Sequence, residues 1–192
     1  MPEIATPNVQ TSLSPPVIAH HEAGHAVAGI VLGVPFIEVR IVPSEDGKIG
    51  VPLKTNPWVA PRPPFNPPGE FTDEEWAELS QDDAKWEAWQ KKDNDNYAVF
   101  MLAGKAAQIE YAGTARDEDA KFDYSFIQHV LPDCYARLAE LEAEATQLVK
   151  GYWLAVLAVA AELLNRSKLT ADEVREIFER TMPGVQLPKS KG

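Results

Sequence analysis

Cysteine is nearly absent from this chain, and positive charge is scarce. The single cysteine, Cys134, cannot form an internal disulfide, and nothing near it resembles a thiolate metal site, so we interpret it as an inert core or surface thiol. Only 18 Lys and Arg residues stand against 29 Asp and Glu residues, for a formal net charge of -11. An acidic surface repels phosphate backbones, and we therefore expect no nucleic-acid partner.

Long apolar runs are also missing. The longest extends from Tyr152 to Leu164 and is interrupted by Glu162, which leaves it well short of the roughly 20 apolar residues that a membrane helix needs. The segment from Met1 to Ser14 has neither a basic start nor an apolar core, so it does not resemble a signal peptide. These features predict a cytoplasmic protein that does not associate with a membrane.

The chain does contain enough apolar material for a core, since 45% of its 192 residues are hydrophobic. This length and composition predict one globular domain. We expect a flexible arm over residues 1–13, the domain over residues 14–182 and a basic, mobile tail over residues 183–192.

The first helix is predicted over residues 15–32. Ser14 can cap its free N–H groups, and Pro15 suits the first turn because it has no N–H to leave unpaired. Gly33, followed closely by Pro35, is typical of a helix end.

A strand is predicted next, over residues 36–42, where apolar and charged residues alternate. A turn over residues 44–48 and a returning strand over residues 49–51 would complete a hairpin. We expect little β-structure elsewhere.

Six prolines between residues 57 and 68 exclude a helix or a central strand there, so residues 54–70 are predicted to form an extended loop. A helix resumes at Thr72, which forms a capping-box pattern with Glu75. We expect the tryptophans of this helix to pack on the core. The alternative is that the helix forms a lid or a partner surface.

The rest of the chain is predicted to be helical, which makes the fold class mainly α (α+β with a small β-hairpin or sheet). The predicted helices are residues 97–111, ended by Gly113; residues 122–131, stopped by Pro132; residues 134–164, as one helix or as two with a break near Gly151; and a last helix that follows the capping-box pattern of Thr170 and Glu173 and ends near Arg180.

The most informative residues are His21, Glu22 and His25, which form a His-Glu-x-x-His pattern inside the first predicted helix. Positions i and i+4 lie on one face of a helix, so the two imidazoles can bind a common zinc ion (Zn2+). Glu22 lies about 100° further around the helix. It can therefore flank the metal and act as the general base that takes a proton from a zinc-bound water.

Gly24 predicts close packing of another element against this helix, because glycine inside a helix otherwise costs about 1 kcal/mol.

A catalytic zinc ion usually has a third protein ligand. The long metzincin pattern would need a glycine at position 28 and a histidine at position 31, where this chain has Ala28 and Val31, so that class is excluded. His129 is one candidate for the third ligand, and the chain's many carboxylates are the better one.

The segment His21-Glu22-Ala23-Gly24-His25 followed by Ala26-Val27 resembles the zinc-binding helix of the FtsH-type peptidases, the proteolytic domain of membrane-anchored AAA proteases. The resemblance continues in chain order over most of residues 17–180. Its further points are Ile41-Val42-Pro43, Leu102-Ala103-Gly104-Lys105-Ala106-Ala107, and a closing region that runs from Leu157 to Leu164 and then from Leu169 to Val174.

The resemblance implies a helical zinc-peptidase domain whose third metal ligand is an aspartate at the start of the helix after the Ala-Gly-x-Ala-Ala segment. Asp123 is the best match to that position, and Asp119 is the second. The chain departs from the family in having Gln108 where a glutamate is common, and residues 56–95 look like an insertion. The family's ATPase and transmembrane segments have no counterpart here, so ATP-driven unfolding is not carried over.

The sequence therefore predicts a zinc-dependent, ATP-independent metalloendopeptidase that acts on peptides or unfolded protein segments. A non-catalytic interaction module braced by zinc is one alternative, and a zinc hydrolase acting on a non-peptide amide is another. The resembling family assembles into rings, which implies a homo-oligomer, although no feature of this sequence identifies an interface.

Overall fold

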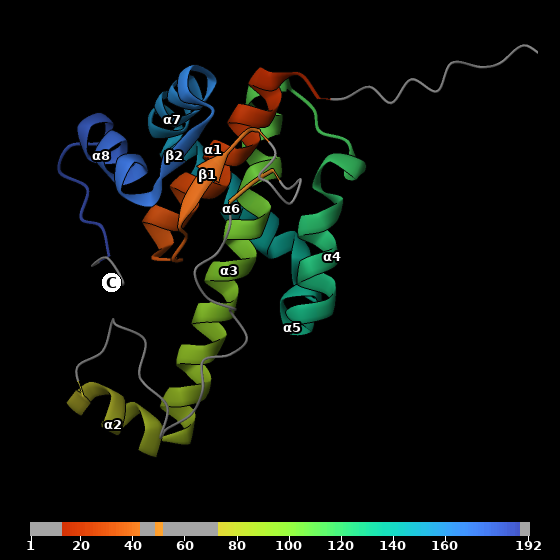
Figure 1. Ribbon diagram of the computed structural model, residues 1–192. Coiled ribbons are helices and arrows are strands. Elements are labelled where there is room, and N and C mark those ends of the chain that lie inside the picture. Colours follow the sequence, from red (N-terminus) through yellow and green to blue (C-terminus); the bar gives the residue numbers. More distant parts are fainter. Residues whose placement is uncertain (1–12, 43–48, 52–72, 189–192) are drawn as a thin grey trace, which may run out of the picture.

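The computed structural model describes residues 13–42, 49–51 and 73–188, which form a mainly α-helical fold with a small antiparallel sheet (Figure 1). This confirms the predicted fold class. In chain order the elements are α1 (Pro15–Leu32), β1 (Glu38–Arg40), α2 (Asp73–Gln81), α3 (Asp83–Ala112), the 3-10 turn η1 (Asp117–Ala120), α4 (Lys121–Val130), α5 (Pro132–Tyr135), α6 (Leu138–Gly151), α7 (Trp153–Arg166), β2 (Lys168–Thr170) and α8 (Ala171–Thr181).

Helix α1 is the central helix of the fold, and it has the predicted bounds. Every residue from Ala19 to Ile30 is buried, because α3, α7 and α8 surround it. Gly33 ends the helix in the left-handed conformation, with φ of 73°. The side chain of Ser14 makes no capping hydrogen bond. The start of the helix therefore depends on the prolines of its first turn and not on the predicted serine cap.

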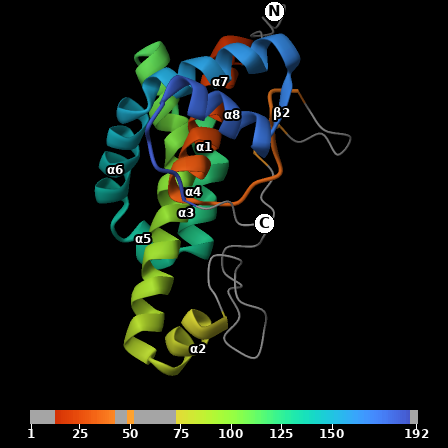
Figure 2. The same cartoon turned by 90° about the vertical axis from the view of Figure 1, so that its left-hand side faces the viewer.

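The prediction of a helix that begins at Thr72, followed by a separate helix over residues 97–111, is wrong. The break comes earlier, at Asp82, whose Oδ1 accepts a hydrogen bond from the backbone N–H of Lys85 and caps a new helix. That helix, α3, then continues for 30 residues and ends at Gly113, as predicted. Its first half extends beyond the other helices and carries α2 at its far end (Figures 1 and 2).

The described tryptophans of this region do not pack on the main core. Trp86 is buried against Leu79 and Trp89, and these residues form a small cluster separate from the main hydrophobic core. The rings of Trp86 and Trp89 lie 5.2 Å apart between centroids. The tryptophans therefore stabilise the junction of α2 with α3.

The sheet contains a strand that the sequence did not indicate. β1 pairs with β2 in antiparallel register, with Val39 opposite Leu169, and both of these side chains are fully buried. β2 lies outside the predicted hairpin, in a part of the chain for which the sequence predicts little β-structure. The predicted returning strand over residues 49–51 is reduced to a single bridge, in which Arg40 and Gly50 exchange two backbone hydrogen bonds of 3.2 Å.

The C-terminal half follows the predicted helical order with small changes. α4 ends before Pro132 as expected, and the short α5 precedes α6. The predicted break near Gly151 is present, and α6 and α7 meet there at an angle of 77°. α8 begins with the predicted capping box, in which Thr170 and Glu173 satisfy each other's backbone N–H groups.

In the part of the chain that the structure describes, no single helix is long and apolar enough to cross a membrane. The bent pair of α6 and α7 has the required length and composition only when the two helices are taken together.

Several predictions concern residues outside the described ranges. They are the flexible arm up to residue 12, the turn over residues 44–48, the proline-rich loop and the capping role of Thr72.

Helices α1 and α3 pack closely because a glycine lies at their crossing. A Cβ atom at Gly24 would come within 2.4 Å of the Ala103 carbonyl oxygen and 2.6 Å of the Ala107 Cβ. The close packing predicted from Gly24 is thereby confirmed, and α3 supplies the opposing surface.

We expect Gly24→Ala to destabilise the fold, because the opposing Ala103 carbonyl belongs to the backbone and cannot move aside easily. Overpacking of this kind costs about 1–3 kcal/mol, measurable as a lower free energy of unfolding in urea. Gly151→Ala is the matched control, since a Cβ there would meet nothing within 4 Å. Equal stability of the two variants would contradict the close contact.

Candidate metal centre

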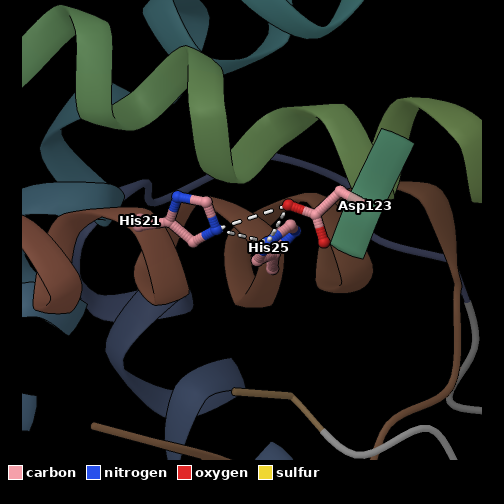
Figure 3. Close-up of side chains that lie close together, drawn as sticks. All are labelled: His21, His25 and Asp123. Carbon is pink, nitrogen blue, oxygen red and sulfur yellow. Dashed lines mark hydrogen bonds and ion pairs between the residues drawn. The ribbon is translucent and has the colours of Figure 1, made fainter. Parts of the chain in front are cut away.

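Three predicted site residues come together from two helices. His21 and His25 lie one turn apart on α1, and Asp123 lies in the first turn of α4. All three side chains are buried. Figure 3 shows the two imidazoles and the carboxylate facing one another between the helices.

The three potential ligand atoms form a compact triangle. The Nε2 atoms of His21 and His25 are 3.1 Å apart, and Oδ2 of Asp123 lies 3.5 Å from the first and 3.6 Å from the second. Three ligand atoms placed about 2.0–2.2 Å from one zinc ion in a tetrahedral arrangement lie roughly 3.3–3.6 Å apart. The triangle therefore has the dimensions of three corners of a metal coordination sphere.

The orientation of each imidazole is determined by its other nitrogen. Nδ1–H of His25 donates a 2.8 Å hydrogen bond to the backbone carbonyl of Phe100, and Nδ1–H of His21 donates a 3.2 Å hydrogen bond to Oε1 of Gln108. Because Nδ1 carries the proton in both neutral rings, each Nε2 is left with a lone pair. Metal-binding histidines commonly have an outer hydrogen bond of this kind.

Two nitrogen lone pairs and a carboxylate oxygen thus face one point in the protein interior. Such an arrangement is repulsive unless a proton or a metal cation lies between the ligand atoms. The described residues His21, His25 and Asp123 therefore form a group that could hold a metal ion.

The electrostatic environment of the metal-free site separates the two histidines. Burial lowers the pKa of His21, but its contact with Asp123 and the charge of Glu22 more than offset this effect, so its pKa lies above the ordinary value. Burial lowers the pKa of His25 below its ordinary value despite the nearby Asp123. In the absence of metal, His21 is therefore the better proton acceptor of the pair.

Of the two aspartates considered for the third ligand, the structure brings Asp123 to the histidines and holds Asp119 elsewhere. The side chain of Asp119 pairs with the Arg116 guanidinium at 2.7 Å and accepts a 2.8 Å hydrogen bond from Nε2 of Gln108. His129, the other histidine considered, is exposed on α4, and its Nδ1 donates to the Ser125 carbonyl at 2.7 Å.

Glu22 is buried beside the triangle. Among the described residues, one of its carboxylate oxygens, Oε2, has no hydrogen-bond partner. Burial raises the pKa of Glu22 to about 7, an effect that the charge of His21 partly opposes. Gly50, from the bridge with β1, lies against this carboxylate, so that a Cβ there would be 3.4 Å from Oε2. A buried carboxylate with a free oxygen can accept a proton from a bound water.

Sequence reasoning missed the part that Gly104 plays. A Cβ on Gly104 of α3 would lie 2.3 Å from Nε2 of His25 and 2.7 Å from Nε2 of His21. Only glycine leaves these nitrogens free at this point of α3. The available signal was a glycine in the interior of a helix, which is unfavourable without a packing reason.

The same reasoning also missed Phe100, whose backbone carbonyl binds His25, and Gly50. Neither contact follows from residue type, because any residue has a carbonyl oxygen and a glycine in a loop has many explanations.

No protein-family model matches this chain, and a search of curated proteins finds no match either. The candidate metal centre therefore rests on the geometry and chemistry of the chain's own residues.

We expect Gly104→Ala to abolish tight metal binding, because the added methyl group would occupy space next to both Nε2 atoms. The loss of affinity should exceed the 10–100-fold that changes in outer-shell residues typically cause. Competition titration with a chromogenic chelator measures it, and circular dichroism establishes that the variant is folded. Gly151→Ala should bind metal as the wild type does. Unchanged affinity in Gly104→Ala would mean that metal does not bind at Nε2 of these histidines.

Proposed function

We propose that this chain is a zinc-dependent metallopeptidase in which His21, His25 and Asp123 hold the metal and Glu22 acts as the general base. The observation that carries the proposal is the convergence of two Nε2 lone pairs and one carboxylate oxygen within 3.6 Å of one another. Beside them lies Glu22, whose Oε2 has no hydrogen-bond partner among the described residues.

Zinc is the metal that this donor set fits best. Two neutral imidazoles and one carboxylate are a common ligand set of catalytic zinc, and they leave a fourth position open. Magnesium and calcium prefer sites made of oxygen atoms, and the two nitrogens disfavour them.

When bound, zinc supplies Lewis-acid activation of water and of a substrate carbonyl. The work of the chain is to hold and to move a proton. Glu22 follows His21 on α1, so its carboxylate would lie beside a bound metal without being a ligand. Its Oε2, which has no hydrogen-bond partner among the described residues, can take a proton from water there. The same carboxylic acid can then give that proton to the leaving amine.

Peptides or unfolded protein segments are the proposed substrates. This assignment follows the resemblance to FtsH-type peptidases, and the proposed reaction needs no ATP, because proton transfer and carbonyl activation require only Glu22 and the metal.

A non-catalytic module braced by zinc is the second candidate, and the burial of the site favours it. His21, Glu22, His25 and Asp123 each expose less than a tenth of their surface in the described part of the chain. A brace has no use for a base, however, and the unpartnered oxygen of Glu22 is costly to bury without a function. Hydrolysis is therefore the better account.

We expect the purified protein to contain about one zinc ion per chain, by elemental mass spectrometry. Asp123→Ala should lower zinc affinity strongly, because it removes one of the three proposed metal ligands. Ser125→Ala, two residues further along α4, is the control and should retain wild-type affinity. A folded wild-type protein that takes up no added zinc would refute the metal assignment.

We expect Glu22→Gln to lower kcat for hydrolysis of an unfolded protein or a peptide library by about 10²–10⁴-fold, the usual contribution of a general base. Zinc content should stay the same, because Glu22 is not a ligand. Glu110→Gln, at an exposed position of α3, is the matched control and should keep full activity.

The wild-type protein and Glu22→Gln, compared with each other, also discriminate among the candidate functions. Wild-type protein that holds zinc but cleaves no peptide favours the braced module. Cleavage of other amides, lost in Glu22→Gln, would instead indicate a zinc hydrolase with a non-peptide substrate. Equal activity of Glu22→Gln and wild type would refute the role of Glu22 as base.

A further inference from the structure

A chain of hydrogen bonds extends outward from His21 and ends on the 3-10 turn η1. Nδ1–H of His21 donates to Oε1 of Gln108, and Nε2 of the same amide donates a 2.8 Å hydrogen bond to Oδ2 of Asp119. Gln108 is 2% exposed and the Asp119 side chain is 4% exposed. Water therefore has little access to either hydrogen bond.

The amide of Gln108 cannot turn over without loss of its contact with Asp119. A carboxylate can only accept hydrogen bonds, so Asp119 requires the NH₂ end of the amide to face it. The carbonyl oxygen must then face His21. That oxygen can only accept, so the proton of the neutral His21 imidazole belongs on Nδ1 and the lone pair on Nε2.

Asp119 is itself held firmly as an acceptor. The guanidinium of Arg116 donates to Oδ1 through Nε at 3.2 Å and through the terminal nitrogen at 2.7 Å, and the backbone N–H of Arg116 donates to Oδ2 at 3.2 Å. Burial alone would raise the pKa of Asp119, but the hydrogen bonds from Arg116 and Gln108 outweigh it and keep that pKa below its ordinary value. Asp119 is therefore ionised at neutral pH.

The hydrogen-bonded series from His21 through Gln108 to Asp119, which we call the relay, also connects the two helices that carry the metal ligands. Gln108 belongs to α3, and Asp119 belongs to the turn that leads directly into α4, four residues before Asp123. The contact between Gln108 and Asp119 therefore holds the start of α4, and with it the third ligand, next to the α1 histidines.

We propose that Asp119 and Gln108 are positioning residues that act in series to fix the Nδ1–H tautomer of His21 and so present Nε2 to the metal. This inference rests on the metal site of the proposed function, and it assigns a role to the aspartate that the sequence left as the second choice for a ligand.

The tautomer of His21 is measurable without any metal. Long-range ¹H–¹⁵N correlation spectra of the metal-free protein at alkaline pH distinguish Nδ1–H from Nε2–H imidazoles, and single His→Gln substitutions assign the four rings. We expect His21 to be the Nδ1–H tautomer in the wild type and a mixture of tautomers in Gln108→Met. A wild-type Nε2–H tautomer at His21 would overturn the relay.

Zinc affinity tests whether Asp119 acts through Gln108. We expect Asp119→Ala and Gln108→Met each to weaken zinc binding by about 10–100-fold, the usual cost of losing an outer-shell partner. In the double variant, Asp119→Ala should cost nothing beyond the Gln108→Met loss, since the relay is already broken. Additive losses would show two independent effects and would contradict action in series.

Two further variants separate positioning from a merely structural role of the turn. Asp119→Asn keeps an oxygen that can accept from Gln108, and we expect it to recover most of the affinity that Asp119→Ala loses. Glu118→Ala removes an exposed carboxylate from the same turn and should leave both the zinc affinity and the His21 tautomer unchanged. A loss in Glu118→Ala equal to that in Asp119→Ala would show that only the charge or the fold of the turn matters.

Failure of this inference differs visibly from failure of the proposed function. If the wild-type protein binds zinc and the losses of zinc affinity in Asp119→Ala and Gln108→Met are additive, the metal site stands and the relay is refuted. Wild-type protein that binds no zinc, while its His21 tautomer depends on Gln108 and Asp119, refutes the zinc assignment and leaves the relay in place.

Discussion

The close approach of α1 and α3 is the constraint on which the rest of the structure depends. Two glycines, one on each helix, permit it: Gly24 lets the backbone of α3 come against α1, and Gly104 leaves room in front of the histidines. Any side chain at either position would need the space now used by the opposing helix or by the imidazoles. The packing of these helices and the shape of the candidate metal centre are therefore one geometric feature.

The polar side chains buried between α1, α3 and α4 have little contact with water. Carboxylates and imidazoles that lose water must find other partners. Among the described residues of this site, Oε2 of Glu22 has no hydrogen-bond partner. The outer nitrogens bind Phe100 and Gln108, which leaves the inner nitrogens and Asp123 directed at a common point. A metal cation at that point would satisfy all three donors together.

The segment from Arg116 to Asp123 links this chemistry to the wider fold. It supplies the acceptor that orients Gln108 and then the carboxylate that completes the triangle. Lys105 and Tyr124 reinforce the same junction, since the Lys105 ammonium donates a 2.9 Å hydrogen bond to the Tyr124 hydroxyl. One short stretch between α3 and α4 thus determines both the outer and the inner environment of His21.

The sequence by itself determined the residues whose roles depend on local spacing. His21 and His25 had to share a helix face because i and i+4 positions do so in any α-helix, and Pro15 and Gly33 predicted the bounds of that helix. The capping box at Thr170 is likewise local.

Tertiary structure alone decided the contacts made across the fold. The pairing of β1 with β2 joins residues about 130 positions apart, and the placement of Asp123 at the histidines, with Asp119 behind Gln108, depends on how η1 packs against α3. Such contacts leave no periodic mark in the sequence, because the energy that selects them comes from the burial and hydrogen bonding of distant segments.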